Sequence, residues 1–277
     1  MVQPVSTCLS SWPFGSNVTK PVIGMLHLLP LPGSPGCDHE WERIRSTMIR
    51  EAEILAENGV HALMLENFGD TPFYPGRVPH YVVAHITALA CEIKRYFPDT
   101  PLGVNVLRND GQSAVAVANA AGCQFVRVNV LCGARIADQG LIEGAAHEVL
   151  RDRAMLNAKQ IKIMADVNVK HSTAVGDSVI ESEVDDTIER GHADAVITSG
   201  SGTGRATEVE ELAAVAAVVR GRVPVFVGSG VSIETIDAYL PHADGFIVGT
   251  AFKRDGIPTN PVDADRVRMF MDQVSYL

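Results

Sequence analysis

The sequence predicts an α/β protein: a single (β/α)8 barrel over residues 21–277, preceded by a short N-terminal arm over residues 1–20. Three observations support this fold. Apolar runs of strand length recur along the chain, each is followed by sequence compatible with a helix, and no linker or change of composition marks a second domain. A doubly wound open sheet is the alternative that the same pattern allows.

Eight apolar runs are the expected strands. They lie at 22–27, 61–66, 102–106, 125–129, 161–166 and 193–197, and within 224–230 and 244–250. Helix signals separate them. Asp38 and Asp110 are the expected N-caps of the first and third helices, and Thr207 and Glu210 have the spacing of a capping box. Apolar stripes or polar helical sequence predict further helices over 82–93, 179–191, 232–240 and 267–274. Another helix is expected to end near residue 158.

Composition excludes several classes of function. The chain has 277 residues, 46% hydrophobic and 20% charged, with a formal net charge of −10, which opposes nucleic-acid binding. No apolar run approaches the roughly 20 residues that span a bilayer, and no basic residue precedes Lys20. We therefore expect a cytoplasmic protein that does not span a membrane. The five cysteines show no C-x-x-C pair, which predicts reduced thiols.

The last two expected strands both end in small residues. Gly228, Ser229 and Gly230 follow the seventh strand, and Gly249 and Thr250 follow the eighth. Glycine allows backbone amides to approach an anion closely, and a (β/α)8 barrel commonly binds phosphate after these two strands. These five residues are the predicted phosphate site, with tight turns as the simpler alternative.

A second glycine-rich segment, 199–204, follows the sixth strand. It lacks the dinucleotide pattern because Arg205 stands where the third glycine should be, and it lacks the Gly-Lys-Ser/Thr of a Walker loop. Its Gly200 and Gly202 are nevertheless candidates for anion binding. A mobile lid is the alternative.

Polar residues recur at the carboxyl ends of the expected strands, which converge on one mouth in a barrel. This pattern predicts a site for a polar, oxygen-rich ligand. Lys170 and His171 lie just past the fifth strand and are secondary candidates. The candidates at the strand ends are His27, Glu66, Asn67, Asn105, Arg127, Asn129, Asp166, Asn168, Thr198 and Ser199.

Glu66 and Asp166 are the main acid–base candidates, because strands two and five face each other across a barrel. His27 is assigned to the same catalytic group. The alternative is that one carboxylate only pairs with Arg127 or Lys170. These carboxylates with a histidine would also suit Mg²⁺ or Zn²⁺, but their wide spacing is no local metal motif, so we predict neither metal nor cofactor.

No strand carries a lysine at the catalytic end of the barrel. Lys162 lies in the fifth expected strand but at its N-terminal end, which is the wrong face for barrel catalysis. The strands therefore give no obvious Schiff-base lysine of the kind that a covalent aldolase needs.

Eight segments carry a family resemblance. They are Val-Ile-Gly-Met-Leu-His with the Pro/Gly-rich sequence after it (22–33), Glu-Asn-Phe-Gly-Asp (66–70), and segments 103–110, 127–129, 166–171, 199–204, 228–230 and 244–250. In this order they resemble the BtpA/SgcQ family over residues 21–256, with the arm outside. The resemblance implies a TIM barrel of the ribulose-phosphate-binding type, related to barrels of tryptophan biosynthesis and phosphosugar isomerisation.

Two functions are compatible with the resemblance. SgcQ-like members are associated with sugar metabolism, which fits an isomerase, epimerase, lyase or transferase acting on a phosphorylated sugar or phosphoribosyl-type substrate by carboxylate acid–base catalysis. The cyanobacterial family name refers to photosystem I biogenesis, which fits a non-catalytic assembly or stability factor for a membrane complex. We favour the enzyme, with a small phosphorylated substrate, and expect a homo-oligomer.

Overall fold

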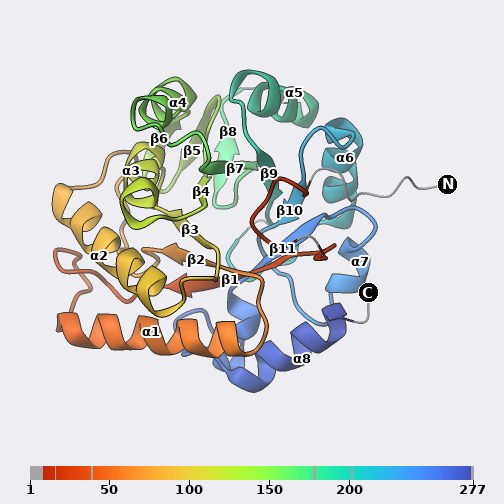
Figure 1. The fold of residues 1–277 in the computed structure, drawn as a ribbon. Helices are drawn as coiled ribbons and strands as arrows, with labels where there is room; N and C mark the ends of the chain where they lie inside the picture. The colour runs from red at the N-terminus through yellow and green to blue at the C-terminus, as the bar shows by residue number, and fades with distance from the viewer. Residues whose placement is uncertain (1–8, 16, 39, 177–178, 201, 276–277) are drawn as a thin grey trace.

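The computed structural model describes residues 9–15, 17–38, 40–176, 179–200 and 202–275. Within these residues, eight parallel strands close into a barrel in the order β1-β11-β10-β9-β7-β4-β3-β2 (Figure 1). They are β1 (Val22–His27), β2 (Ala62–Glu66), β3 (Leu102–Asn105), β4 (Phe125–Val128), β7 (Lys162–Val167), β9 (Ala195–Thr198), β10 (Val225–Val227) and β11 (Gly245–Val248). The predicted (β/α)8 fold is confirmed, and the open sheet is wrong.

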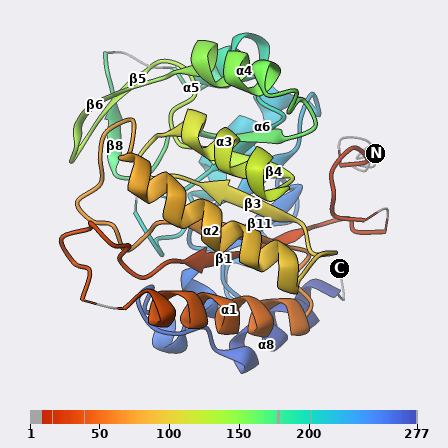
Figure 2. The ribbon, with the colours of Figure 1, turned by 60° about the vertical axis from the view of Figure 1, so that its left-hand side comes forward.

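Helices surround the barrel (Figure 1 and Figure 2). Their apolar faces pack on the outward-facing strand residues in one large core. The helices are α1 (Trp41–Glu57), α2 (His80–Tyr96), α3 (Gly111–Ala121), α4 (Ala146–Met155), α5 (Ile180–Asp185) continuing as a π-helix (Asp186–Arg190), α6 (Val209–Val219), α7 (Ile236–Tyr239) and α8 (Ala264–Ser275). Short 3-10 turns, Thr250–Phe252 and Arg254–Gly256, follow β11.

One of the three predicted helix caps is confirmed. The Asp110 carboxylate accepts a hydrogen bond from the Ser113 backbone N–H at 2.9 Å, as an N-cap does. Asp38 is not the cap of α1, because the helix begins three residues later, after Glu40. The Thr207 capping box is also wrong, because α6 begins at Val209 and the Thr207 hydroxyl donates instead to the Ser229 carbonyl.

Side chains alternate between the inside and the outside of the barrel. Inward residues such as Met64, Phe125 and Phe226 form a separate interior core, while their neighbours along each strand pack under the helices. Trp12 and Phe14 stack on each other and contact both phenylalanines, closing the N-terminal end of the barrel. The described part of the predicted arm is therefore packed against the interior core; residues 1–8 and 16 lie outside the description.

A three-stranded antiparallel sheet adds to the opposite end (Figure 2). It consists of β6 (Gly140–Glu143), β5 (Ala134–Ala137) and β8 (Ser172–Ala174), which come from the segments after β4 and β7. These three strands are not among the eight that the sequence predicts. The short strands give no long apolar run, and Ile142 alone is buried in β6, against Val130 and Val169.

Two predictions from composition bear on the described residues. None of the helices there is both long and apolar enough to cross a membrane. Cys91, Cys123 and Cys132 form no disulfide bond, and burial raises the pKa of the Cys123 thiol to about 12. Cys123 is therefore a packing group at neutral pH, and Cys8 lies outside the described residues.

Candidate active site

Two cavities adjoin at the carboxyl ends of the barrel strands. We call the first, of about 280 Å³, the glycine chamber, because Gly228, Gly230 and Gly249 line it. We call the second, of about 480 Å³, the Arg108 chamber; Phe68, Leu107, Arg108 and Asn129 line it. Both are bordered by the same set of residues, which therefore occupies the boundary between them: Glu66, Arg127, Lys170 and Thr203.

Glu66 lies between His27 and Asn105, because the strand register places these three residues opposite one another at the ends of β1, β2 and β3. The Asn105 side-chain amide donates to Glu66 Oε2 at 2.6 Å. His27 Nε2 lies 3.9 Å from Glu66 Oε1, and His27 Nδ1 is 3.4 Å from the Pro258 carbonyl oxygen. His27 also stacks on Phe68, with ring centroids 4.3 Å apart. The imidazole is thus held beside the carboxylate by a ring stacked on one face and by the Pro258 carbonyl at Nδ1.

Burial and neighbouring cations determine the protonation states of His27 and Glu66. Burial lowers the pKa of His27 to about 4, with Lys253 and Lys170 acting in the same direction against Glu66. Burial alone would raise the pKa of Glu66, but His27, Arg127, Lys170 and the hydrogen bond from Asn105 together hold it below its ordinary value. At neutral pH, Glu66 is a carboxylate and His27 an uncharged imidazole. Such a pair can accept and return a proton.

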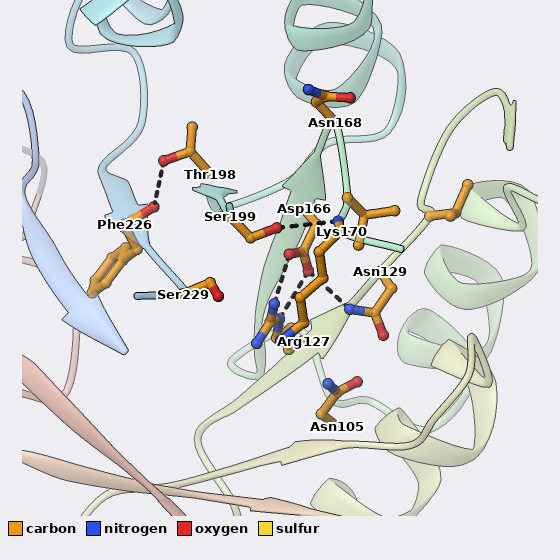
Figure 3. A network of polar contacts seen from close by, with 12 residues as sticks. Asn105, Arg127, Asn129, Asp166, Asn168, Lys170, Thr198, Ser199, Phe226 and Ser229 are labelled. Atoms are coloured by element: carbon orange, nitrogen blue, oxygen red, sulfur yellow. Dashed lines mark hydrogen bonds and ion pairs between the residues drawn. The ribbon is translucent and has the colours of Figure 1, made fainter. Parts of the chain in front are cut away.

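Asp166 is fully engaged by Arg127 and Asn129. Arg127 Nε and Nη2 donate to the two carboxylate oxygens at 2.8 and 2.7 Å, and Asn129 Nδ2 donates at 3.1 Å (Figure 3). The Asp166 side chain is fully buried and borders neither chamber, whereas Arg127 borders both. Asp166 raises the pKa of Arg127 against the effect of burial. The alternative interpretation from the sequence, a carboxylate that pairs with Arg127, therefore describes Asp166.

Lys170 enters the boundary from the segment after β7. Its backbone carbonyl accepts a hydrogen bond from Arg108 Nη2 at 2.6 Å, and its backbone N–H donates to Ser199 Oγ at 3.3 Å. The side chain extends toward Arg127 (Figure 3). Burial and the positive charges of Arg127 and Arg108 lower the pKa of Lys170 to about 8, against the carboxylates of Glu66 and Asp166.

Arg108 is a site residue that the sequence analysis missed, although it lies in the segment 103–110 that carries the family resemblance. The signal that could have identified Arg108 is its position, between the end of strand β3 and the N-cap of helix α3. Arg108 Nε and Asn129 Oδ1 are buried, and no partner for either lies within the described residues. Both residues border the Arg108 chamber. An unpaired donor and an unpaired acceptor there suit the hydroxyl groups of a ligand.

The predicted phosphate residues do come together. Gly228, Ser229, Gly230, Gly249 and Thr250 all border the glycine chamber. Close packing also requires small residues at these positions. Gly230 has φ +64°, and a Cβ there would lie 2.3 Å from Ala206 Cα, while a Cβ at Gly249 would lie 3.0 Å from His27 Cε1.

The glycine-rich segment after β9 contributes differently from the prediction. Thr203 and Gly204 border the glycine chamber, while Gly200 and Gly202 do not. A Cβ at Gly200 would lie 2.3 Å from the Arg205 carbonyl oxygen, and the Gly202 carbonyl accepts from Ser229 Oγ at 2.9 Å. The segment is therefore folded against the β10 loop; its Ser201 lies outside the described residues.

Three predicted ligand residues instead make internal contacts away from both chambers. Asn67 Oδ1 accepts from the Leu107 N–H at 2.7 Å, and Thr198 Oγ1 donates to the Phe226 carbonyl at 3.4 Å. Asn168 lies on the outer side, where its amide donates to Glu211 at 2.8 Å. Ser199 contacts the backbone of Lys170, as described, and likewise borders neither chamber.

His171 borders the Arg108 chamber and connects two loops. Its Nε2 accepts from the Thr203 N–H at 3.1 Å, and burial lowers its pKa, with Lys170 and Arg108 contributing. The described residues contain no group of three or more His, Cys, Asp or Glu side chains arranged to hold a metal ion.

These features define a (β/α)8 barrel with buried ionisable groups around a polar cavity at the carboxyl ends of its strands. Comparison with known sequences gives the family. The sequence model of the BtpA family matches residues 18–276, and the chain belongs to that family. An uncharacterized protein of Thermococcus kodakarensis is 46% identical over 91% of this chain and 94% of its own length. The photosystem I biogenesis protein BtpA of Synechocystis is 41% identical over 92% of this chain and 88% of its own length.

Solved structures share the fold at low sequence identity. KGPDC from Streptococcus mutans matches with a TM-score of 0.57 and 13% identity, covering 94% of this chain and 99% of its own. N-(5'-phosphoribosyl)anthranilate isomerase from Pyrococcus furiosus matches with a TM-score of 0.56 and 12% identity, covering 93% of this chain and 100% of its own. At such identities the likeness shows the TIM-barrel fold alone.

Proposed function

We propose that this protein is an enzyme that acts on a phosphorylated sugar or a phosphoribosyl-type compound by proton transfer. One observation carries the proposal. The buried pair Glu66 and His27 borders the same chamber as Gly228, Gly230 and Thr250. A phosphate held by the glycine loops would thus place the rest of a small substrate beside an acid–base pair.

Charge in the glycine chamber supports an anionic ligand. Arg127, Lys170 and Arg266 border it, and Glu66 is its single carboxylate among the described residues. This local excess of positive charge occurs in a chain whose formal net charge is −10. A cavity of one sign concentrates ligands of the opposite sign. Backbone amides of the small residues add close-range donors without bulk.

The chemistry proposed is removal and return of a proton beside a carbonyl group. Glu66, as a carboxylate, takes the proton. His27 exchanges a proton with a neighbouring oxygen, and the free polar atoms of Arg108 and Asn129 bind hydroxyl groups in the second chamber. Isomerisation, epimerisation and aldol-type cleavage all use this step. Asp166 then serves catalysis by holding Arg127, not by transferring a proton.

Ligand-induced stabilisation tests the proposal. Melting temperatures are measured with D-ribose 5-phosphate, D-ribulose 5-phosphate and triose phosphates, each matched with its unphosphorylated counterpart. We expect stabilisation by at least one phosphorylated compound and not by its counterpart, rising with ligand concentration as mass action requires. Equal responses within every matched pair would overturn the proposal.

The name of the Synechocystis relative favours a second candidate, a non-catalytic factor in assembly of a membrane complex. Ile136 and Leu141 pair across the β5–β6 hairpin and are 52% and 54% exposed, which would suit a protein contact. This role requires no proton transfer. If Glu66→Gln abolishes the cellular phenotype while fold and partner binding persist, the scaffold alone is insufficient.

A further inference from the structure

Lys170 lies at the boundary between the two chambers. β7 ends at Val167, and Lys170 follows three residues later, bordering both the glycine chamber and the Arg108 chamber. Glu66, Arg127 and Thr203 share this boundary. Of these four described residues, Lys170 alone carries a primary amine, which is the group that reacts with carbonyl carbons.

The backbone of Lys170 is anchored while the end of its side chain is not. Arg108 binds its carbonyl at 2.6 Å and Ser199 binds its N–H at 3.3 Å. Within the described part of the chain, Lys170 Nζ has no hydrogen bond or ion pair. Of the carboxylates beside it, Glu66 accepts from Asn105 at Oε2, and both oxygens of Asp166 are bound by Arg127. Such an amine is presented to the cavity and remains available for reaction.

Protein groups bind the buried Lys253 and the half-buried Lys20 and Lys162. Lys253 pairs with Glu51 at 2.7 Å, and Lys20 donates to the carbonyls of Leu240 and Ala243. Lys162, at the opposite end of β7, pairs with Asp194 at 3.3 Å. These lysines therefore stabilise the fold, and their amines are not available to a ligand.

Electrostatics increase the reactivity of Lys170. With a pKa of about 8, about one tenth of its side chains are uncharged at pH 7. An ordinary lysine has about one uncharged side chain in several thousand at that pH. The cause is burial together with the cations of Arg127 and Arg108, so the effect belongs to this position in the fold.

We propose that Lys170 forms an imine with the carbonyl carbon of an open-chain phosphorylated aldose or ketose. The inference rests on the proposed function, because it uses the glycine chamber for the phosphate and Glu66 for proton transfer. It adds the substrate class, a carbonyl compound, and a covalent step. The lysine that the strands lack is thus supplied by the segment after β7.

The step is balanced within the site. The uncharged Nζ attacks the carbonyl carbon, a C–N bond forms, and the carbonyl oxygen takes up the proton that the nitrogen loses. The resulting hydroxyl then takes a second proton and leaves as water, and the nitrogen lone pair completes a protonated C=N bond. Overall, a protonated lysine and a carbonyl give a protonated imine and one water. Glu66, on the same boundary, carries these protons and then removes one from the adjacent carbon, leaving an enamine.

Reductive trapping tests this proposal on the full-length protein. The protein is incubated with D-glyceraldehyde 3-phosphate, dihydroxyacetone phosphate, D-ribose 5-phosphate or D-ribulose 5-phosphate and sodium cyanoborohydride, then analysed by intact mass and peptide mapping. We expect one reduced adduct at Lys170 with at least one compound. Excess inorganic phosphate should suppress it, and unphosphorylated D-ribose should give at least tenfold less.

Variants identify the lysine that carries the reduced adduct. Lys170→Arg and Lys170→Met should abolish it, while the control Lys162→Arg, at the opposite end of β7, should keep it. Circular dichroism verifies that each variant is folded. Two different replacements of Lys170 are made so that the test still stands if one of them does not fold. Labelling spread over exposed lysines such as Lys159, or unchanged in both Lys170 variants, would overturn the proposal.

Failure of the imine and failure of the proposed function are distinguishable. Stabilisation by a phosphorylated compound without any adduct at Lys170 would refute the imine and leave the phosphate site standing. No matched-pair stabilisation and no adduct would refute both.

Discussion

Arg127 holds Asp166 in a two-pronged ion pair, with Nε and Nη2 at 2.8 and 2.7 Å from the two carboxylate oxygens. Both side chains are buried, 2% and 0% exposed. The pair joins β4 to β7, and it places the other face of the guanidinium at the boundary between the chambers. We regard Asp166 as the residue that positions Arg127.

Removing the charge of Asp166 should therefore destabilise the protein. Asp166→Asn leaves the Arg127 guanidinium buried without its counter-charge, and we expect a loss of about 3–5 kcal/mol in the free energy of unfolding. Urea denaturation at pH 7 measures it. A double variant, Arg127→Met with Asp166→Leu, should lose less free energy of unfolding than the two single variants lose in sum, because no charge is left unpaired. A fully stable Asp166→Asn protein would contradict this account.

The buried imidazole of His27 should make stability depend on pH. Its pKa of about 4 lies below the 6.5 of an unfolded chain, so the unfolded state binds more protons between these values. Stability from this group is complete above pH 6.5 and is lost as pH falls toward 4, by roughly 3 kcal/mol. We compare urea denaturation of wild type and His27→Asn across this range. The wild type should show the steeper decline; parallel curves would refute the buried neutral imidazole.

Glu66→Gln should separate binding from chemistry. Glutamine keeps an oxygen that accepts from Asn105 but cannot take a proton. For any phosphorylated compound that the wild type converts, we expect kcat to fall about 10²- to 10⁴-fold with little change in stabilisation by the ligand. Glu53→Gln, an exposed change on α1, is the control and should leave kcat unaltered. An equal kcat in wild type and Glu66→Gln would exclude Glu66 as the base.

Arg266 should strengthen anion binding from the rim of the glycine chamber. It is exposed and its Nε is fixed by the Ala251 carbonyl at 2.7 Å. We expect Arg266→Gln to weaken binding of a stabilising sugar phosphate by about two- to fivefold, an effect that shrinks at high salt. Titration calorimetry measures it. Arg268→Gln, on the same helix and paired with Asp265, is the control, and equal losses in both variants would argue against a local role.

Gly230 should be sensitive to substitution whether or not a ligand is present. A Cβ there meets Ala206 Cα at 2.3 Å on a backbone with φ +64°. Gly122 has φ +72° but nothing within 4 Å, so Gly122→Ala measures the conformational cost alone, about 1 kcal/mol. We expect Gly230→Ala to cost at least 1–3 kcal/mol more, by urea denaturation. Equal losses of unfolding free energy in Gly230→Ala and Gly122→Ala would show that the contact with Ala206 does not restrict residue 230.

The barrel could be predicted because its signals are local. Each strand is a short apolar run, and alternation along β1 and β2 directs His27 and Glu66 inward together with Met25 and Met64. The sheet of β5, β6 and β8 could not, because its strands are short and bury few side chains, and because β8 joins β5 from a distant segment of the chain.

Side-chain partners at the mouth also depend on tertiary structure. Asp166 and Asn168 have the same parity in the sequence, but a φ of +48° at Asn168 ends the strand alternation and turns that residue outward. Asp166 meets Arg127 diagonally across two strands, since Arg127 is in register with Met164. The turn at Asn168 has no signal in the sequence, and the sequence alone does not decide which carboxylate pairs with Arg127. The glycines at 228, 230 and 249 were found because small residues after two neighbouring strands do leave a signal there.

A crystal structure of the protein with D-ribose 5-phosphate tests the central claim most directly. Our account predicts the phosphate in the glycine chamber, in contact with the backbone of residues 229–230 and Thr250, and the sugar carbons directed to Glu66 and Lys170. A phosphate bound outside this chamber, or a sugar directed away from Glu66, would contradict it.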